Sequence, residues 1–103
     1  MRIAEVIGVV TLSRVHPSVR GARWIIGVPF SRSGLAAGRP DGEDIVLLDV
    51  LGAGVGQRVG FTEGAEAAAP FTPAKKPVDA YAGCILDRIY LHDDRASSTE
   101  DGR

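Results

Sequence analysis

The sequence predicts an all-β protein with one short helix, folded as a small five-stranded OB-like β-barrel. Short stretches of apolar, β-type residues recur along the 103 residues. Glycines stand inside several of these stretches, where they typically mark bends at barrel corners. An alanine-rich stretch before the last strand predicts the helix. Closing the sheet into a barrel removes the edges that would otherwise aggregate.

The first two strands are expected at Ile3–Leu12 and Ala22–Phe30. Apolar residues alternate in both, which is the pattern of a strand with one face toward a core. Gly8 lies inside the first strand and predicts a bend there. In the second strand, Trp24 and Phe30 share a face and are both expected in the core.

The middle of the chain is expected to hold a loop and two further strands. Several glycines and a proline predict the loop at Ser31–Asp44. The near-continuous apolar run Ile45–Leu51 predicts a strand buried on both faces, and a short fourth strand is expected at about Gln57–Thr62. Strands with two apolar faces leave one face outside the barrel, and such a surface usually marks a contact between subunits.

The C-terminal part is expected to contain the helix, the last strand and a tail. The helix is predicted at Glu63–Ala69, where Pro70 ends it, and the fifth strand at about Asp79–Leu91. Residues 92–103 contain no large apolar side chain, so a disordered tail is expected there. The predicted organisation is therefore one barrel domain at residues 1–91 followed by this tail.

Composition disfavours several classes of function. The net charge of −1 gives no electrostatic footprint for nucleic acid or for an anionic membrane. No stretch approaches the ~20 apolar residues of a membrane span, and Glu5 stands where a signal peptide would need an apolar run. The single cysteine, Cys84, cannot form an intrachain disulfide and is expected to be a small buried hydrophobe. These observations favour a cytosolic protein.

One stretch, residues 49–59, places glycine at three alternate positions, Gly52, Gly54 and Gly56. Such spacing serves a phosphate, a tight turn or a crowded subunit junction. A dinucleotide site is disfavoured because Gln57 occupies the position of the fingerprint's third glycine, and β-type residues follow instead of a helix. Asp49 is expected to accept backbone N–H bonds at the end of the preceding strand.

No catalytic, metal-binding or cofactor-binding site is predicted, so the protein is not expected to be an enzyme. His16 has no second histidine or cysteine at ligand spacing, and metal sites need three or four ligands in a fixed geometry. The tail residues His92, Asp93 and Asp94 are expected to be solvated rather than to hold a metal ion.

Four blocks of the sequence carry a family resemblance: Arg2–Val10, Gly21–Val28, Asp49–Gly56, and Lys76–Ala80 with Ile85–Asp87. In their order and spacing they resemble the EutN/CcmL family, the pentameric vertex proteins of bacterial microcompartment shells. The third block, similar to D-x-(V/I)-G-A-G-x-G, is the most specific. The chain departs from the family pattern at Gln57, where glutamate is usual, and at Gly64–Ala68, where G-S-S-A-R is common.

The resemblance implies a homopentamer that caps the vertices of a polyhedral shell in the bacterial cytoplasm, beside hexameric shell proteins. It places a pore or subunit interface at Asp49 and at Gly52, Ala53, Gly54, Val55 and Gly56. Five subunits that meet at an axis crowd their inner loops, and only small residues permit that approach. An ordinary tight turn is the alternative for this run. Glu66 and Lys76 are candidate contacts with neighbouring shell proteins.

An OB-fold nucleic-acid-binding protein is the alternative function. Such proteins combine a basic groove with stacking aromatic residues. The six aromatic residues of this chain lie mostly inside the predicted strands, and Lys75–Lys76 is the main basic cluster. A native mass of five chains favours the vertex protein, whereas a monomer that binds an oligonucleotide favours the alternative.

Overall fold

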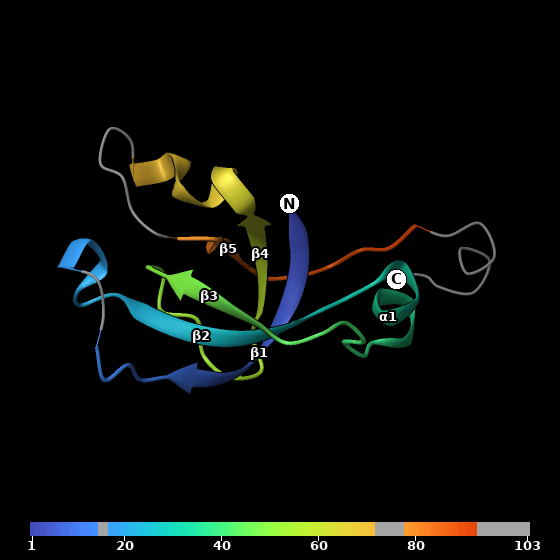
Figure 1. Ribbon diagram of the computed structural model, residues 1–103. Helices are drawn as coiled ribbons and strands as arrows, with labels where there is room; N and C mark the ends of the chain where they lie inside the picture. The colour runs from blue at the N-terminus through green and yellow to red at the C-terminus, as the bar shows by residue number, and fades with distance from the viewer. Residues whose placement is uncertain (15–16, 72–77, 93–103) are drawn as a thin grey trace.

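Five strands of the computed structural model close into a barrel in the order β1-β2-β3-β5-β4 (Figure 1). The structure describes residues 1–14, 17–71 and 78–92. The strands are β1 (Arg2–Val10), β2 (Arg23–Pro29), β3 (Ile45–Asp49), β4 (Arg58–Glu63) and β5 (Ala80–Leu86). The helical segments are the α-helix α1 (Arg32–Ala37) and the 3-10 helices η1 (Pro17–Val19) and η2 (Gly64–Phe71). The predicted five-stranded, OB-like barrel is confirmed.

The barrel closes at β1, which pairs antiparallel with both β2 and β4. An extra residue between Val6 and Gly8 shifts the register of β1 against β2, in agreement with the bend predicted at Gly8. Beyond this bulge, residues 8–10 pair with β2, whereas the pairing with β4 covers only residues 2–5. Bulges bend and twist a strand. The end of β1 and the start of β2 accordingly leave the barrel as a two-stranded ribbon (Figure 1).

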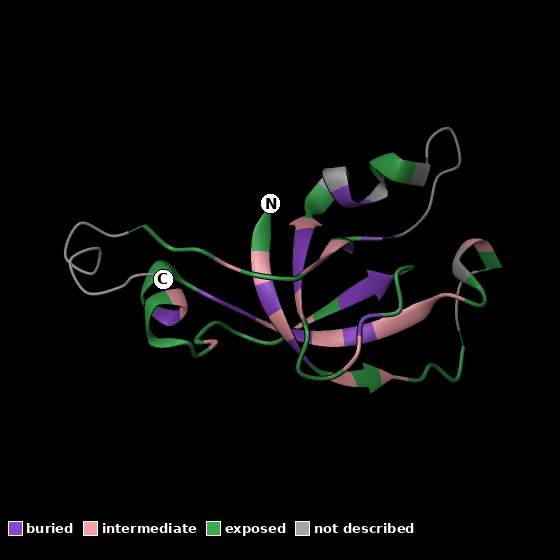
Figure 2. Ribbon diagram, turned by 180° about the vertical axis from the view of Figure 1, so that it is seen from behind, coloured by how far each residue is buried: buried purple, intermediate pink, exposed green. Residues whose placement is uncertain are grey.

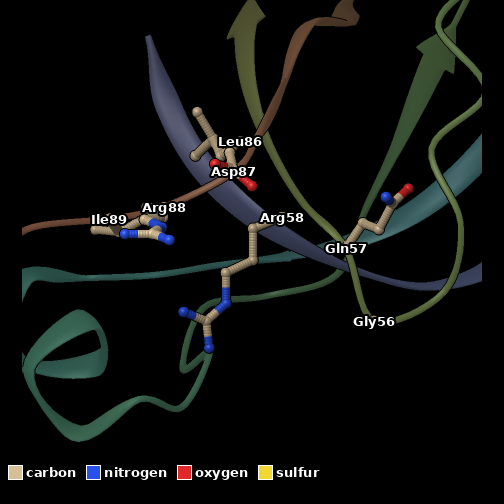
Figure 3. A pocket seen from close by; sticks show the side chains of 7 residues that line it. All are labelled: Gly56, Gln57, Arg58, Leu86, Asp87, Arg88 and Ile89. Carbon is tan, nitrogen blue, oxygen red and sulfur yellow. The ribbon is translucent and has the colours of Figure 1, made fainter.

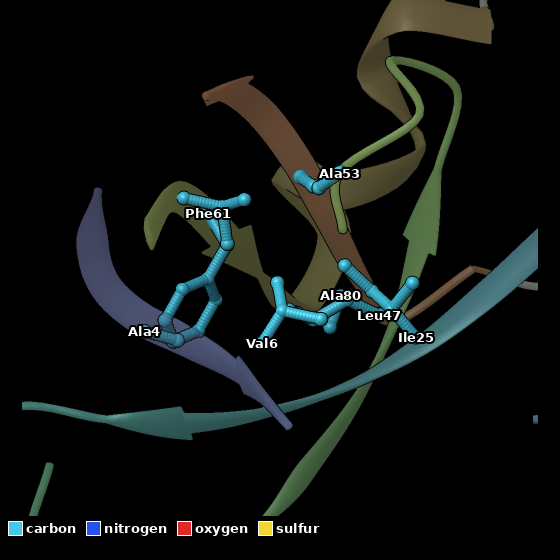
Figure 4. Packing of buried hydrophobic residues seen from close by; sticks show 9 residues of the cluster. Ala4, Val6, Ile25, Leu47, Ala53, Phe61 and Ala80 are labelled. Atoms are coloured by element: carbon cyan, nitrogen blue, oxygen red, sulfur yellow. The ribbon is translucent and has the colours of Figure 1, made fainter. Parts of the chain in front are cut away.

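The barrel interior is filled by nine buried apolar side chains (Figure 4). They are Ala4, Val6, Ile25, Leu47, Ala53, Val59, Phe61, Ala80 and Ala82. Each large side chain among them stabilises the fold by about 1.5–3 kcal/mol relative to exposure. Ala53 comes from the glycine run rather than from a strand, so this run is anchored directly in the core.

A second, smaller cluster of buried residues covers the outside of the barrel over β3. Its buried members are Leu48, Ala67 and Val78, with Trp24 packed against them. Successive residues of a strand point to opposite faces. Leu47 therefore fills the barrel while Leu48 joins the outer cluster, and the prediction of a strand buried on both faces is confirmed at these two positions. It is wrong at Val46, which is exposed, and at Val50 and Leu51, which follow the end of β3 at Asp49 and are exposed as well.

The inner face of β2 differs from the prediction. Ile25 and Gly27 point into the barrel, so Trp24 lies half-buried on the outer face and does not share a core face with Phe30. Both faces of β2 are apolar, so alternation alone did not select the inner one. Space selects it: a Cβ at Gly27 would lie 3.0 Å from Leu47 Cδ1 and 3.2 Å from Ala4 Cβ.

The predicted loop at residues 31–44 contains α1, so that prediction is wrong for six of its residues. Ser31 caps the helix, because its Oγ accepts a hydrogen bond from the backbone N–H of Gly34 at 3.0 Å. Gly38 ends the helix in the left-handed conformation, with φ of 72°. A helix of six residues is too short to show the periodic spacing of apolar residues that predicts helices. The capping residues Ser31 and Gly38 were the main indications of it in the sequence.

Three details of the C-terminal part also differ from the predictions. The predicted short helix is η2, a 3-10 helix that continues through Pro70 instead of ending there. The fixed φ of proline, about −65°, is compatible with 3-10 geometry. β5 ends at Leu86 rather than Leu91, because Leu86 pairs with Arg58, the first residue of β4. Cys84 is half-buried rather than buried, with Sγ 4.0 Å from Met1 Sδ.

Some predictions fall outside the described residues. They concern His16, Lys75 and Lys76, and the tail from Asp93 onward, whereas His92 is described and exposed. Within the described segments, no helix has the length and apolar character needed to cross a membrane.

Candidate functional site

The glycine run forms the connection from β3 to β4, and Asp49 shapes its first half. The carboxylate of Asp49 is buried and accepts hydrogen bonds from three backbone N–H groups. These belong to Leu51 at 2.9 Å, Gly52 at 3.2 Å and Ala53 at 2.7 Å. The expectation that Asp49 accepts backbone hydrogen bonds at the strand end is confirmed. One buried side chain therefore fixes the path of the following four residues.

Arg23 completes this arrangement from the neighbouring strand. Arg23 lies directly opposite Asp49 in the β2–β3 register. Its Nη1 donates to Asp49 Oδ2 at 2.5 Å and to the carbonyl oxygen of Ala53 at 2.6 Å. A buried carboxylate is tolerated only when it is paired and hydrogen-bonded, and Arg23 together with three N–H groups meets that requirement. Sequence reasoning missed Arg23, because both faces of β2 are apolar and the sequence did not show that Arg23 shares a face with the buried Ile25.

The three glycines of the run have different local reasons to be glycine. Gly52 and Gly56 have positive φ angles of 83° and 91°, a region that side chains with a Cβ rarely adopt. Gly54 lies outside this region, and a Cβ built on it would meet only Gln57 Oε1, at 3.7 Å. The chain itself therefore requires glycine at two of the positions but leaves room for a side chain at Gly54.

The exposed large apolar side chains include two groups of three, one in the β3–β4 connection and one near the end of β1; Met1, Val46, Tyr90 and Leu91 are exposed elsewhere. We call the first the loop patch; it comprises Val50, Leu51 and Val55, of which Val55 is 67% exposed. We call the second the ribbon patch; it comprises Ile7, Val9 and Leu12. A groove of about 410 Å³ runs along the ribbon, between residues 9–12 and residues 21–24.

A polar pocket of about 380 Å³ lies between residues 56–58, at the end of the glycine run, and residues 86–89, which begin at the last residue of β5 (Figure 3). Arg58, Asp87 and Arg88 contribute its charged groups. Arg58 is already engaged, because its guanidinium stacks over the ring of Phe30 at 4.9 Å and its Nε lies 3.5 Å from Glu5 Oε1. The lining contains no serine, cysteine or histidine that a neighbouring base would activate.

Chemistry-bearing groups are sparse in the described part of the chain. No three residues among its histidines, cysteines, aspartates and glutamates gather closely enough to hold a metal ion. The hydrogen bonds that Asp41 accepts from the side chain and backbone N–H of Ser31 lower the pKa of Asp41 below its usual 3.8. This pair stabilises the start of α1, at a distance in sequence from the glycine run.

The predicted site residues fall into two groups. Asp49 and residues 52–56 lie together in one connection, beside Arg23. Glu66 lies on η2, away from this connection in the chain, and Lys76 lies outside the described residues.

The chain is similar to known shell proteins over most of its length. The family model described as ethanolamine utilisation protein EutN/carboxysome matches residues 1–87. The carboxysome shell vertex protein CcmL of Synechococcus elongatus is 34% identical over 89 residues, which are 86% of this chain and 86% of that protein. The bacterial microcompartment shell vertex protein PduN of Salmonella typhimurium is 29% identical over 89 residues, 86% of this chain and 98% of that protein. The solved GrpN pentameric microcompartment shell protein from Rhodospirillum rubrum gives a TM-score of 0.75 at 25% identity, covering 89% of this chain and all of that one.

Proposed function

The chain belongs to the EutN/CcmL family, and we infer from this membership that it is a structural protein of a bacterial microcompartment shell. Five copies form a ring that caps a vertex of the shell, as the names of its relatives indicate for those proteins. Such shells are protein bodies in the cytoplasm, which places the chain there. The relatives of this chain are named as structural components of shells, and we propose no catalytic role for it.

The surface of the barrel supports a ring. A cyclic ring is built from one heterologous contact repeated in one direction, so each subunit needs two different complementary surfaces. The loop patch and the ribbon patch are two such surfaces, and both expose large aliphatic side chains. Exposed apolar surface of this kind is typical of subunit interfaces. The presence of two apolar patches on one barrel is the observation that carries the proposal.

Gly54 supports placing the glycine run at the junction between subunits. Its own chain leaves space for a side chain there, so a small residue at this position is better explained by a neighbouring molecule. Val55, the next residue, is among the most exposed apolar side chains of the described chain. We therefore propose that residues 52–56 lie near the ring axis or against the adjacent subunit, held in shape by Asp49.

The proposed neighbours of the ring are hexameric shell proteins. Glu66 and Lys76 remain our candidates for contacts with them. η2, which carries Glu66, lies on the outside of the barrel (Figure 1), where a neighbouring shell protein has access. Neither a membrane nor nucleic acid is a proposed partner.

Nucleic-acid binding is the alternative, and the placement of the aromatic residues argues against it. Binding of single strands relies on exposed aromatic faces for stacking. Phe30 and Phe61 are buried, and arginines already cover both rings, Arg58 at 4.9 Å and Arg2 at 5.6 Å. Of the aromatic side chains that the structure describes, Tyr90 alone is largely exposed.

Native mass tests the proposed function directly. Light scattering at micromolar concentration should give five times the 10.8 kDa of one chain. A stable monomer or dimer would contradict the vertex role. Retardation of a single-stranded oligonucleotide at physiological salt would instead favour the alternative, because such binding depends on phosphate neutralisation.

A further inference from the structure

The described chain ends in an arm that leaves the barrel. We define the arm as residues 87–92, which follow the end of β5 and extend away from the other strands (Figure 1). Tyr90 is 74% exposed and Leu91 is exposed as well. The backbone hydrogen bonds between described residues include none from residues 88–91. Residues 88–91 of the arm thus present large apolar side chains and backbone groups without a described partner to their surroundings.

The residues of the arm suit a strand. Ile89, Tyr90 and Leu91 include β-branched and aromatic types that are enriched in strands, and the sequence itself predicted that the last strand continues to Leu91. The strand ends early at Leu86 because β4 offers no partner beyond Arg58. The arm is therefore a segment with the residue types of a strand, for which β4 provides no further pairing residues.

A matching acceptor lies on the ribbon. Gly8, Val9 and Val10 pair with β2 on one side, and the described strands provide no partner on the other side. An unpaired edge of this kind is a template for a strand from another chain. The groove of about 410 Å³ is lined by residues from both strands of the ribbon, including Val9 and Val10 of this edge and the apolar residues Leu12, Ala22 and Trp24. The free edge offers hydrogen-bonding backbone groups to an incoming strand, and the groove offers apolar contacts to its side chains.

The arm cannot reach the groove of its own chain. The arm and the tip of the ribbon lie at opposite ends of the molecule in both views (Figures 1 and 2). An arm that enters this groove must therefore come from a second copy.

Charge favours the same pairing. Residues 9–24, which include the groove, contain no aspartate or glutamate; besides Arg23, which is paired with Asp49, they contain Arg14 and Arg20. The arm is followed in the sequence by Asp93 and Asp94. An arm laid along the ribbon brings these two carboxylates toward Arg14 and Arg20, although the arm also carries Arg88, and complementary charges orient such contacts.

We propose that the arm of each subunit docks on the ribbon of the next subunit. Residues 88–91 pair with the free edge of β1 at residues 8–10, so that Leu91 enters the groove and Tyr90, the adjacent residue of the strand, points to the opposite face. The proposal rests on the proposed pentameric ring and names the contact that closes it. Because donor and acceptor lie at opposite ends of one chain, the contact repeats in one direction, as a cyclic ring requires.

Two truncated chains test the arm. A chain ending at Asp87 lacks the docking segment, whereas a matched control ending at Asp94 keeps it and loses only the tail. The first is expected to retain its β-type circular dichroism and to fall from the mass of five chains to that of one at micromolar concentration. The control is expected to keep the mass of five. A ring of unchanged mass in the shorter chain overturns the proposal.

Cross-linking identifies the partner even if truncation harms folding. In a Cys84→Ser background, one chain carries Leu91→Cys and a second chain carries Leu12→Cys, and the two are mixed, unfolded, refolded and treated with a short bismaleimide. Covalent dimers of one chain of each kind are expected, and neither chain alone should form them. Absence of these dimers in rings of normal mass overturns the arm contact and leaves the vertex role intact. Absence of rings in the unmodified protein contradicts the vertex role itself.

Discussion

Gln57 and Gly54 close the glycine run on itself through two hydrogen bonds. Gln57 Oε1 accepts from the backbone N–H of Gly54 at 2.7 Å, and the backbone N–H of Gln57 donates to the carbonyl of Gly54 at 3.0 Å. The family that this chain resembles usually has glutamate at this position. A carboxylate accepts the same bond as an amide oxygen, so the change from glutamate to glutamine preserves the geometry and removes a charge.

Replacing Gln57 tests this interpretation. Gln57→Glu should leave the free energy of unfolding nearly unchanged, because the acceptor is retained. Gln57→Leu should lower it by about 0.5–1.5 kcal/mol, the usual net value of one hydrogen bond. Urea denaturation of both variants measures the difference. Equal stability of the two variants would mean that the side-chain bond contributes little to the loop.

Removal of the Asp49 carboxylate should cost far more. Asp49→Ala leaves three backbone N–H groups and the Arg23 guanidinium without their acceptor. Loss of one partner of a buried ion pair typically costs about 3–5 kcal/mol, and we expect the lower end because the Arg23 side chain is 38% exposed. Asp49→Asn, which keeps one acceptor oxygen, should fall between this variant and the parent in denaturant unfolding. A loss below about 1 kcal/mol for the alanine variant contradicts the role assigned to Asp49.

Valine at Gly54 and at Gly52 should act on different properties. Gly52→Val forces a β-branched residue into a positive φ and should lower the stability of the barrel by about 1–3 kcal/mol. Gly54→Val meets no such strain within the chain, so its barrel should fold while the ring weakens. Circular dichroism and native mass, read side by side, separate the two effects. If the Gly54→Val protein keeps the full mass of five chains, Gly54 does not lie at the junction between subunits.

The cap of α1 should be sensitive to acid. The folded pKa of Asp41 is lowered by its hydrogen bonds to Ser31, so this contribution to stability is present above pH 3.8 and is lost as the pH falls through the folded pKa. Ser31→Ala removes the side-chain bond and should raise the pKa of Asp41 toward 3.8. Carbon-detected NMR titration of the carboxyl group measures the shift. An unchanged pKa in the variant would show that the side-chain bond is not its cause.

The sequence predicted the positions of the strands better than the contacts that their side chains make. Alternating and continuous apolar runs located all five strands, because burial imposes a local period. The inner face of β2 was not predictable, since both of its faces are apolar and the choice depends on how Gly27 packs against Leu47. The role of Asp49 followed from its place at a strand end. Its pairing with Arg23 spans 26 positions and depends on a register that no local pattern specifies.

The opposite placement of the arm and the ribbon gives the assembled vertex a direction. A ring of five copies in cyclic symmetry has two faces that no rotation interchanges, because every chain circulates in the same sense. A shell likewise separates two unlike environments, the enclosed space and the surrounding cytoplasm. Each face of the cap therefore meets a single environment, and a peptide fused at one exposed position of that face would be displayed toward the same environment in all five copies.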